Sequence, residues 1–127
     1  MSEGVFGLAR VVDDGLLKRS SQTTAFGTAG VSVSAKKGRL YHLRVNNKAA
    51  ATKYFVQIFD KATAPVNTNV PIWEGQVAAN TDVVFDFGLF GLAVTNGIGI
   101  AISTTSGVLT LAAAADGNAY ALYTANP

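Results

Sequence analysis

Asp82 and Asp86 are the two carboxylates whose spacing comes closest to that of a catalytic pair. They lie four residues apart in segment 81–87, which alternates apolar and polar side chains as a strand does. Four residues of extended chain span about 13 Å, whereas glycoside hydrolases hold their two carboxyl groups about 5 to 9.5 Å apart. We therefore interpret both as solvent-facing residues. Folding could bring Asp60 or Glu74 to either of them, but no spacing in the sequence predicts it.

His42 is the only histidine, and the chain has no cysteine. These counts exclude a His-pair metal site, a thiolate metal site and a cysteine nucleophile. His42 alternates with Arg44 on the polar side of an expected strand, and no nucleophile-elbow pattern accompanies it. The glycines at 88, 91, 97 and 99 do not form a phosphate-binding loop between a strand and a helix. We expect no catalytic residue, no cofactor and no metal ion.

Two further groups of residues suggest ligands, and each has a simpler interpretation. Lys36, Lys37 and Arg39 form a basic segment, but nucleic-acid binding also calls for exposed aromatic residues, and Tyr41 alternates inward. We interpret the basic residues as solvated turns and expect no nucleic-acid partner. Trp73 could stack on a sugar, yet a tryptophan that follows Pro-Ile more often caps the hydrophobic edge of a sandwich.

The composition predicts a single domain with a surface of low charge. The 127 residues are 49% hydrophobic and 14% charged, against about 25% charged in an ordinary domain. All ten Lys and Arg residues lie at or before Lys61, and only acidic charges follow it. The basic first half and the acidic second half of the chain could form surfaces of opposite charge that meet between subunits or on a host lattice. Alternatively, the charged residues could simply lie in solvated turns. Acidic residues interrupt residues 1–20, and segment 85–102 contains four glycines, so we expect neither a secretory signal nor a membrane segment.

Alternating apolar side chains predict short strands at 29–35, 39–46, 81–87 and 98–105. Segments 108–113 and 119–124 are expected to close the domain as a hairpin across Asp116-Gly117-Asn118. About eight strands and no amphipathic helix indicate an all-β fold, an antiparallel β-sandwich or jelly roll. The predicted core consists of Tyr41, Leu43, Val45, Val83, Phe85, Ile98, Ile100 and Ile102.

Segment 53–60 is apolar on both faces, because Phe55 and Phe59 lie opposite the expected inward residues. A strand of this kind is either central and covered on both sides or placed at a subunit contact. Together with the low charge it predicts a homo-oligomer, for which a closed trimer is our choice.

Residues 1–28 are expected to form an N-terminal arm, and residues 29–127 the sandwich domain. The apolar residues of the arm have no regular spacing, so we expect them to contact a partner rather than the core. The candidate partner-contact residues are Val5, Phe6, Leu8, Leu16, Leu17, Phe55 and Phe59.

Several strand motifs resemble those of small β-sandwich structural proteins of tailed bacteriophages. They are YFVQIFDKA at 54–62, Ala64-Pro65, Pro71-Ile72-Trp73 and GIGIAISTT at 97–105, and the resemblance covers about residues 38–124. It implies a non-enzymatic virion protein, made in the host cytoplasm, that decorates the capsid or associates with a fibre. Its partners would be other capsid or tail proteins. The resemblance carries over no catalytic residue.

A second function of a different class stays open at this point. A carbohydrate- or receptor-binding module of the same fold would use Trp73, Tyr54 and the turns at one end of the sandwich. Binding to glycans would favour this alternative, and binding to virion parts would favour the structural one.

Overall fold

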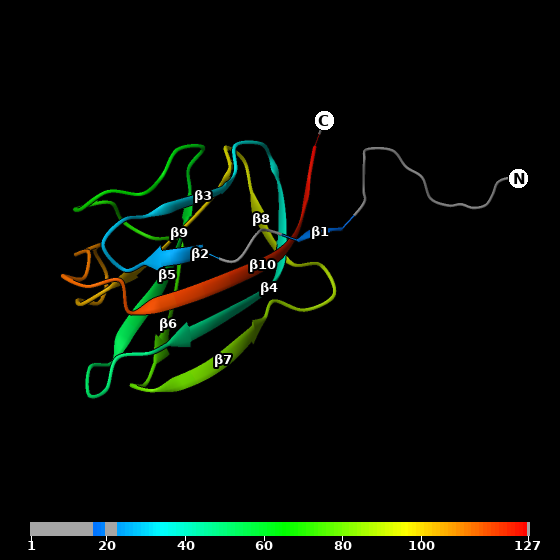
Figure 1. Ribbon diagram of the computed structural model, residues 1–127. Helices are drawn as coiled ribbons and strands as arrows, with labels where there is room; N and C mark the ends of the chain where they lie inside the picture. Colours follow the sequence, from blue (N-terminus) through cyan, green and yellow to red (C-terminus); the bar gives the residue numbers. More distant parts are fainter. Residues whose placement is uncertain (1–16, 20–22, 127) are drawn as a thin grey trace, which may run out of the picture.

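The computed structural model describes residues 17–19 and 23–126, and every regular element in them is a β-strand (Figure 1). None of these residues belongs to a helix that could cross a membrane. The strands are β1 (Lys18–Arg19), β2 (Thr23–Phe26), β3 (Val31–Ser34), β4 (Gly38–Asn47), β5 (Tyr54–Asp60), β6 (Trp73–Val77), β7 (Thr81–Asp86), β8 (Leu92–Val94), β9 (Ile98–Ser103) and β10 (Gly117–Ala125).

The strands form two antiparallel sheets that pack face to face. The β10–β4 sheet has the order β2-β10-β4-β7, with short β1 added beside β10 and short β8 beside β4. The β9–β5 sheet has the order β3-β9-β5-β6. Figure 1 shows β2, β10, β4 and β7 side by side in front of the second sheet. From β2 the chain passes repeatedly between sheets, which gives the eight-strand order of a jelly roll and confirms the predicted all-β class.

The core lies between the two sheets, where the alternating apolar residues meet. Leu43, Val45 and the three isoleucines of β9 are at most 1% exposed, as predicted. Val83 and Phe85, on the edge strand β7, are partly buried and pack against this cluster. An edge strand covers its inward side chains less completely than a central strand does.

Tyr41 was expected in the core, and this prediction is wrong because β4 contains a β-bulge. Leu122 of β10 lies opposite His42, but the next residue of β10, Tyr123, lies opposite Leu40. Tyr41 is therefore the extra residue, and the buried positions Leu40 and Leu43 are three apart instead of two. A bulge reverses the in-out alternation beyond it, so Tyr41 and His42 both lie toward the outer side.

The strand that is apolar on both faces, β5, is central and covered by its own chain. It lies between β9 and β6, and residues 104–112, which we call the covering segment, pass over its outer face. Phe59 is 2% exposed in a second small cluster with Ala101 and Leu109, against which Leu111 packs. Phe59 is thus not an accessible partner contact, which corrects that prediction.

The predicted closing hairpin is also wrong. Residues 108–113 form no strand, and Leu111 makes only an isolated bridge to Ser103. Strand β10 pairs along its whole length with β4 instead. Ser103 holds the covering segment in its place: its buried hydroxyl accepts from the amide of Thr110, 3.0 Å away, and donates to the carbonyl of Thr105 at 2.7 Å.

The sandwich begins before the expected boundary at residue 29. Strands β1 and β2 pair with β10, and Phe26 is fully buried in the main core. The boundary between residues 28 and 29 therefore falls inside the sandwich. The irregular apolar spacing of this segment hid the strand, because β2 is only four residues long and Phe26 is the one large apolar residue in its sequence.

Candidate functional site

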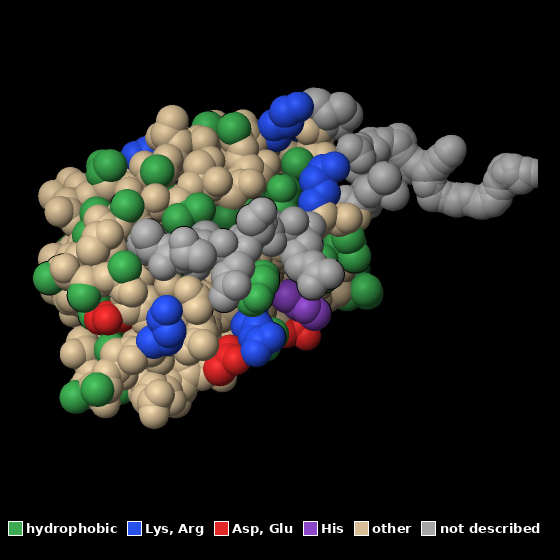
Figure 2. Space-filling view, viewed as in Figure 1, with side chains coloured by type: hydrophobic (Ala, Val, Ile, Leu, Met, Phe, Trp, Pro, Cys, Tyr) green, Lys and Arg blue, Asp and Glu red, His purple; other side chains and the backbone are tan. Residues whose placement is uncertain are grey.

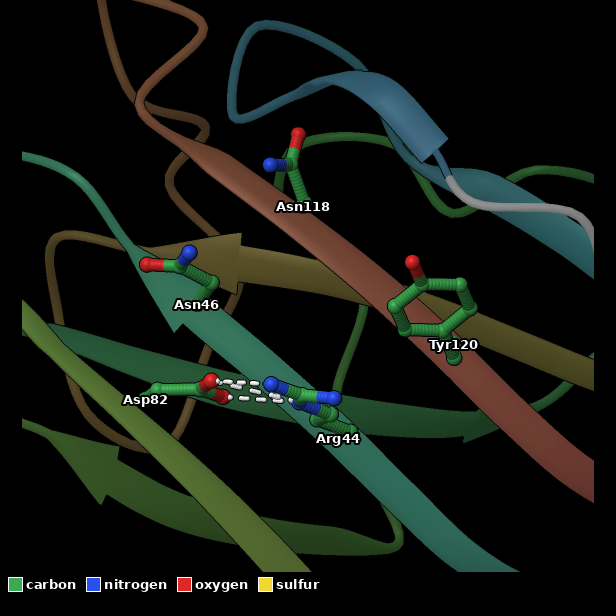
Figure 3. A pocket seen from close by; sticks show the side chains of 5 residues that line it. All are labelled: Arg44, Asn46, Asp82, Asn118 and Tyr120. Atoms are coloured by element: carbon green, nitrogen blue, oxygen red, sulfur yellow. Dashed lines mark hydrogen bonds and ion pairs between the residues drawn. The ribbon is translucent and has the colours of Figure 1, made fainter.

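Five side chains line a shallow depression of about 90 Å³ on the outer face of the β10–β4 sheet (Figure 3). They come from three neighbouring strands and are polar or aromatic: Arg44, Asn46, Asp82, Asn118 and Tyr120. We call this set the sheet-face site.

Strand register brings these side chains together. Asn46 of β4 lies opposite Asn118 of β10 on one side and Asp82 of β7 on the other. Two residues further along, Arg44 lies opposite Tyr120. Because side chains of a strand alternate between faces, residues two apart share the outer face, and these rows form one polar grid. Figure 3 shows the side chains on the same side of the sheet.

Arg44 and Asp82 form the central interaction of the site. The Nη2 and Nε atoms of Arg44 donate to the carboxylate of Asp82 over 2.5 to 3.2 Å, drawn as dashed lines in Figure 3. The hydrogen bond and the charge of Asp82 raise the pKa of Arg44, and the hydrogen bonds from Arg44 lower the pKa of Asp82. The positive charge of Arg44 and the negative charge of Asp82 cancel, so the net charge of the sheet-face site is zero.

Asp86 lies opposite His42, a second basic residue of β4. Its Oδ1 lies 3.5 Å from Nε2 of His42, and both side chains are about half exposed or more. Asp82 and Asp86 thus each face a basic residue of β4, on the solvent side as predicted. Among the described residues, no serine or threonine hydroxyl donates a hydrogen bond to His42.

Asp60 and Glu74, which the sequence left as possible partners of Asp82 and Asp86, accept hydrogen bonds from loop residues instead. Asp60 accepts hydrogen bonds from the backbone amides of Thr95 and Asn96 at 2.7 to 3.1 Å. Partial burial alone would raise the pKa of Asp60, but these amides outweigh it and the pKa is lowered. Asp60 thereby fixes the turn between β8 and β9.

Glu74 ties the covering segment to β6. Its carboxylate accepts hydrogen bonds from the hydroxyl of Ser106 at 2.5 Å, the amide of Gly107 at 2.9 Å and the side chain of Gln57 at 2.7 Å. Burial opposes ionisation, yet the three donors together lower its pKa. Within the described part of the chain, no group of three or more His, Asp or Glu side chains is placed to hold a metal ion.

The residues named for the alternative ligand site do not form one. Tyr54 is 4% exposed, and its hydroxyl donates to Asp116 over 2.6 Å. Trp73 packs edge-on against Phe85 and Phe87, with ring centroids 5.0 and 4.9 Å apart. The register of β5 with β6 also separates them, because Tyr54 lies opposite Val77 and Trp73 lies opposite Ile58, at the two ends of the strand pair.

A second surface feature is an apolar depression beside the sheet-face site. Leu89 and Phe90, in the loop between β7 and β8, are 85% and 76% exposed. Leu89, Leu17, Tyr41 and other residues line a hollow of about 420 Å³. Figure 2 shows hydrophobic side chains close to the purple His42 at this end of the molecule. We call Leu89, Phe90 and this hollow the apolar end.

The candidate partner-contact residues have different outcomes. Leu17 is 59% exposed and belongs to the apolar end. Phe55 is half-buried, and the ammonium of Lys53 lies 5.7 Å from its ring centroid. The others, apart from buried Phe59, lie outside the described residues: Val5, Phe6, Leu8 and Leu16.

Sequence reasoning missed both surface features for identifiable reasons. The alternation at 42–46 and 82–86 indicated outward side chains, but Asn118 and Tyr120 join them only through the pairing of β10 with β4. Leu89 and Phe90 stand between Gly88 and Gly91, both with positive φ, and that flanking pattern is a readable signal for an exposed loop tip.

Comparison of the chain with family models, curated proteins and solved structures found no match.

Proposed function

We propose that this protein is a non-enzymatic structural protein of a tailed-bacteriophage virion, a capsid decoration or fibre-associated protein that acts through protein–protein contacts. The virion assignment is supported by the strand motifs at 54–62 and 97–105. The jelly-roll order is compatible with it, since viral capsid domains use this fold among others.

The apolar end is the observation that carries the contact role. Two adjacent large side chains, Leu89 and Phe90, project almost fully into solvent beside an apolar hollow. Exposed apolar groups gathered in this way mark interaction surfaces, whereas scattered ones do not. Burying each of them against a partner contributes about 1.5 to 3 kcal/mol.

The proposal includes self-association in a closed trimer. The low charge of the chain supports it, whereas strand 53–60 does not, because the chain itself covers β5. Light scattering at tens of micromolar protein tests this part, and a monomeric mass would remove it.

Co-sedimentation with virus particles that lack the protein tests attachment. We expect the wild type to sediment with the particles and the double variant Leu89→Ser, Phe90→Ser to bind at least tenfold more weakly. Val70→Ser is the matched control, because Val70 is 73% exposed and lines a different depression. If mass spectrometry of purified particles does not find the chain, the virion assignment is wrong.

A further inference from the structure

We propose that the sheet-face site binds a neutral carbohydrate, one sugar ring at a time. This function is separate from the attachment proposed above, uses different residues, and does not depend on it. The site shares no residue with the ligand site first expected at Trp73 and Tyr54, since Trp73 packs edge-on against Phe85 and Tyr54 is buried.

The sheet-face site offers hydrogen-bonding groups that have no partner in the part of the chain that the structure describes. Within the described residues, the carboxamide of Asn46, the hydroxyl of Tyr120 and the Nη1 atom of Arg44 make no hydrogen bond, although all three line the depression. Carboxamide and hydroxyl groups both donate and accept, and a guanidinium nitrogen donates. Sugar hydroxyls also donate and accept, so each can pair with such a mixed set.

The depression carries no net charge. Among the described residues, its ionised lining groups are Arg44 and Asp82, and they neutralise each other through bidentate hydrogen bonds. A phosphate or carboxylate ligand would have to compete with Asp82 for the same guanidinium. A neutral polyhydroxyl ligand instead adds hydrogen bonds and leaves the ion pair intact.

The spacing of the side chains fits one sugar ring. Side chains opposite each other on antiparallel strands are about 4.5 to 5.5 Å apart, and residues two apart along a strand are about 7 Å apart. Arg44, Asn46, Tyr120 and Asn118 occupy the four corners of one such cell. A pyranose ring with its substituents matches this size, and the Tyr120 ring supplies an apolar surface with a polar tip at the edge of the cell.

The depression is shallow, and this limits affinity. A volume of about 90 Å³ equals that of about three water molecules. The site therefore contacts one edge or face of a sugar and does not enclose it. We expect dissociation constants in the millimolar range for a single site, and stronger apparent binding when several copies face one polysaccharide.

Nuclear magnetic resonance of the 127-residue chain, labelled with nitrogen-15, tests the proposal. The probes are glucose, galactose, mannose, N-acetylglucosamine, maltose, cellobiose and lactose, each added up to about 50 mM to reach millimolar affinities. We expect at least one probe to give saturable shifts of the Asn46 and Asn118 side-chain amides. No saturable shift with any probe would overturn the proposal.

Variants then assign the binding to these residues. Asn46→Ala and Tyr120→Ala should each weaken binding about tenfold, while Gln76→Ala, which removes an exposed carboxamide from β6 in the other sheet, should leave it unchanged. Unchanged melting temperatures confirm that each variant is folded. Binding by Asn46→Ala and Tyr120→Ala equal to wild type would place the sugar elsewhere and contradict the proposal.

A variant without the Asp82 charge tests the preference for neutral sugars. Asp82→Asn leaves Arg44 as an unpaired cation, so this variant should gain affinity for glucuronic acid relative to glucose. Wild-type protein that prefers glucuronic acid over every neutral probe would refute the assignment to neutral sugars. Shifts that appear at the sheet face only when virion proteins are added, and with no sugar, would make it a protein interface instead.

Discussion

Replacement of Leu109 by alanine tests whether the segment over β5 is an integral part of the fold. Leu109 is 2% exposed and packs on Phe59 and Ala101 of the outer face. The substitution removes three carbon atoms, which corresponds to about 2.4 kcal/mol of transfer free energy at about 0.8 kcal/mol per carbon. A cavity term adds to this, but a loop collapses more readily than a core strand. We expect a total loss of about 3 kcal/mol.

The free energy of unfolding from urea titrations measures this loss directly. For a chain of this size, about 3 kcal/mol lowers the melting temperature by about 10 °C. Val108→Ala is the control. Val108 is next to Leu109 in the chain, but its side chain is 38% exposed, so its truncation should cost less than about 1 kcal/mol.

Two results would refute the reasoning. Equal unfolding free energies for Leu109→Ala and wild type would mean that the segment adds no burial. An unchanged melting temperature together with fast amide exchange of Thr104 and Leu109 would mean that the segment opens locally, without the rest of the sandwich. In the structure the two amides donate to the carbonyls of Thr110 and Asn69, so both should be protected in the wild type.

Four further outcomes are expected. Ile100→Asp places a charge in the fully buried centre of β9 and should cost several kcal/mol, so that circular dichroism shows an unfolded chain; a folded variant would contradict the core assignment. The pKa of Glu74 is lowered on folding, so its contribution to stability is present above the unfolded pKa near 4.5 and is lost as the pH falls; Glu74→Gln should flatten urea stability between pH 6 and 3. The hydrogen bond to a carboxylate and burial raise the pKa of Tyr54 to about 12, so stability should fall as the pH rises from about 10 to 12, and ultraviolet titration should show one late tyrosine that Tyr54→Phe removes. Deletion of residues 1–16 should leave the melting temperature unchanged, whereas deletion of residues 1–26 removes β1, β2 and a buried phenylalanine and should lower it by about 10 °C or more.

The all-β class and part of the core can be read from the residues alone. Strands β5, β7 and β9 lie where alternation or an apolar run placed them, and Ile98, Ile100 and Ile102 are buried as predicted. These features are readable because burial of one strand face imposes a period of two on the residues themselves, whichever strand lies alongside.

The other features depend on which distant segments meet, so they appear only in the folded chain. Tyr41 leaves the core through a bulge that exists only in the pairing of β4 with β10. Residues 108–113 look like a strand but cover β5, since Leu109 finds its apolar partners there and β10 takes the place beside β4. The sheet-face site unites residues 44, 82 and 120 from three strands, and no local pattern records a register between strands that are tens of residues apart.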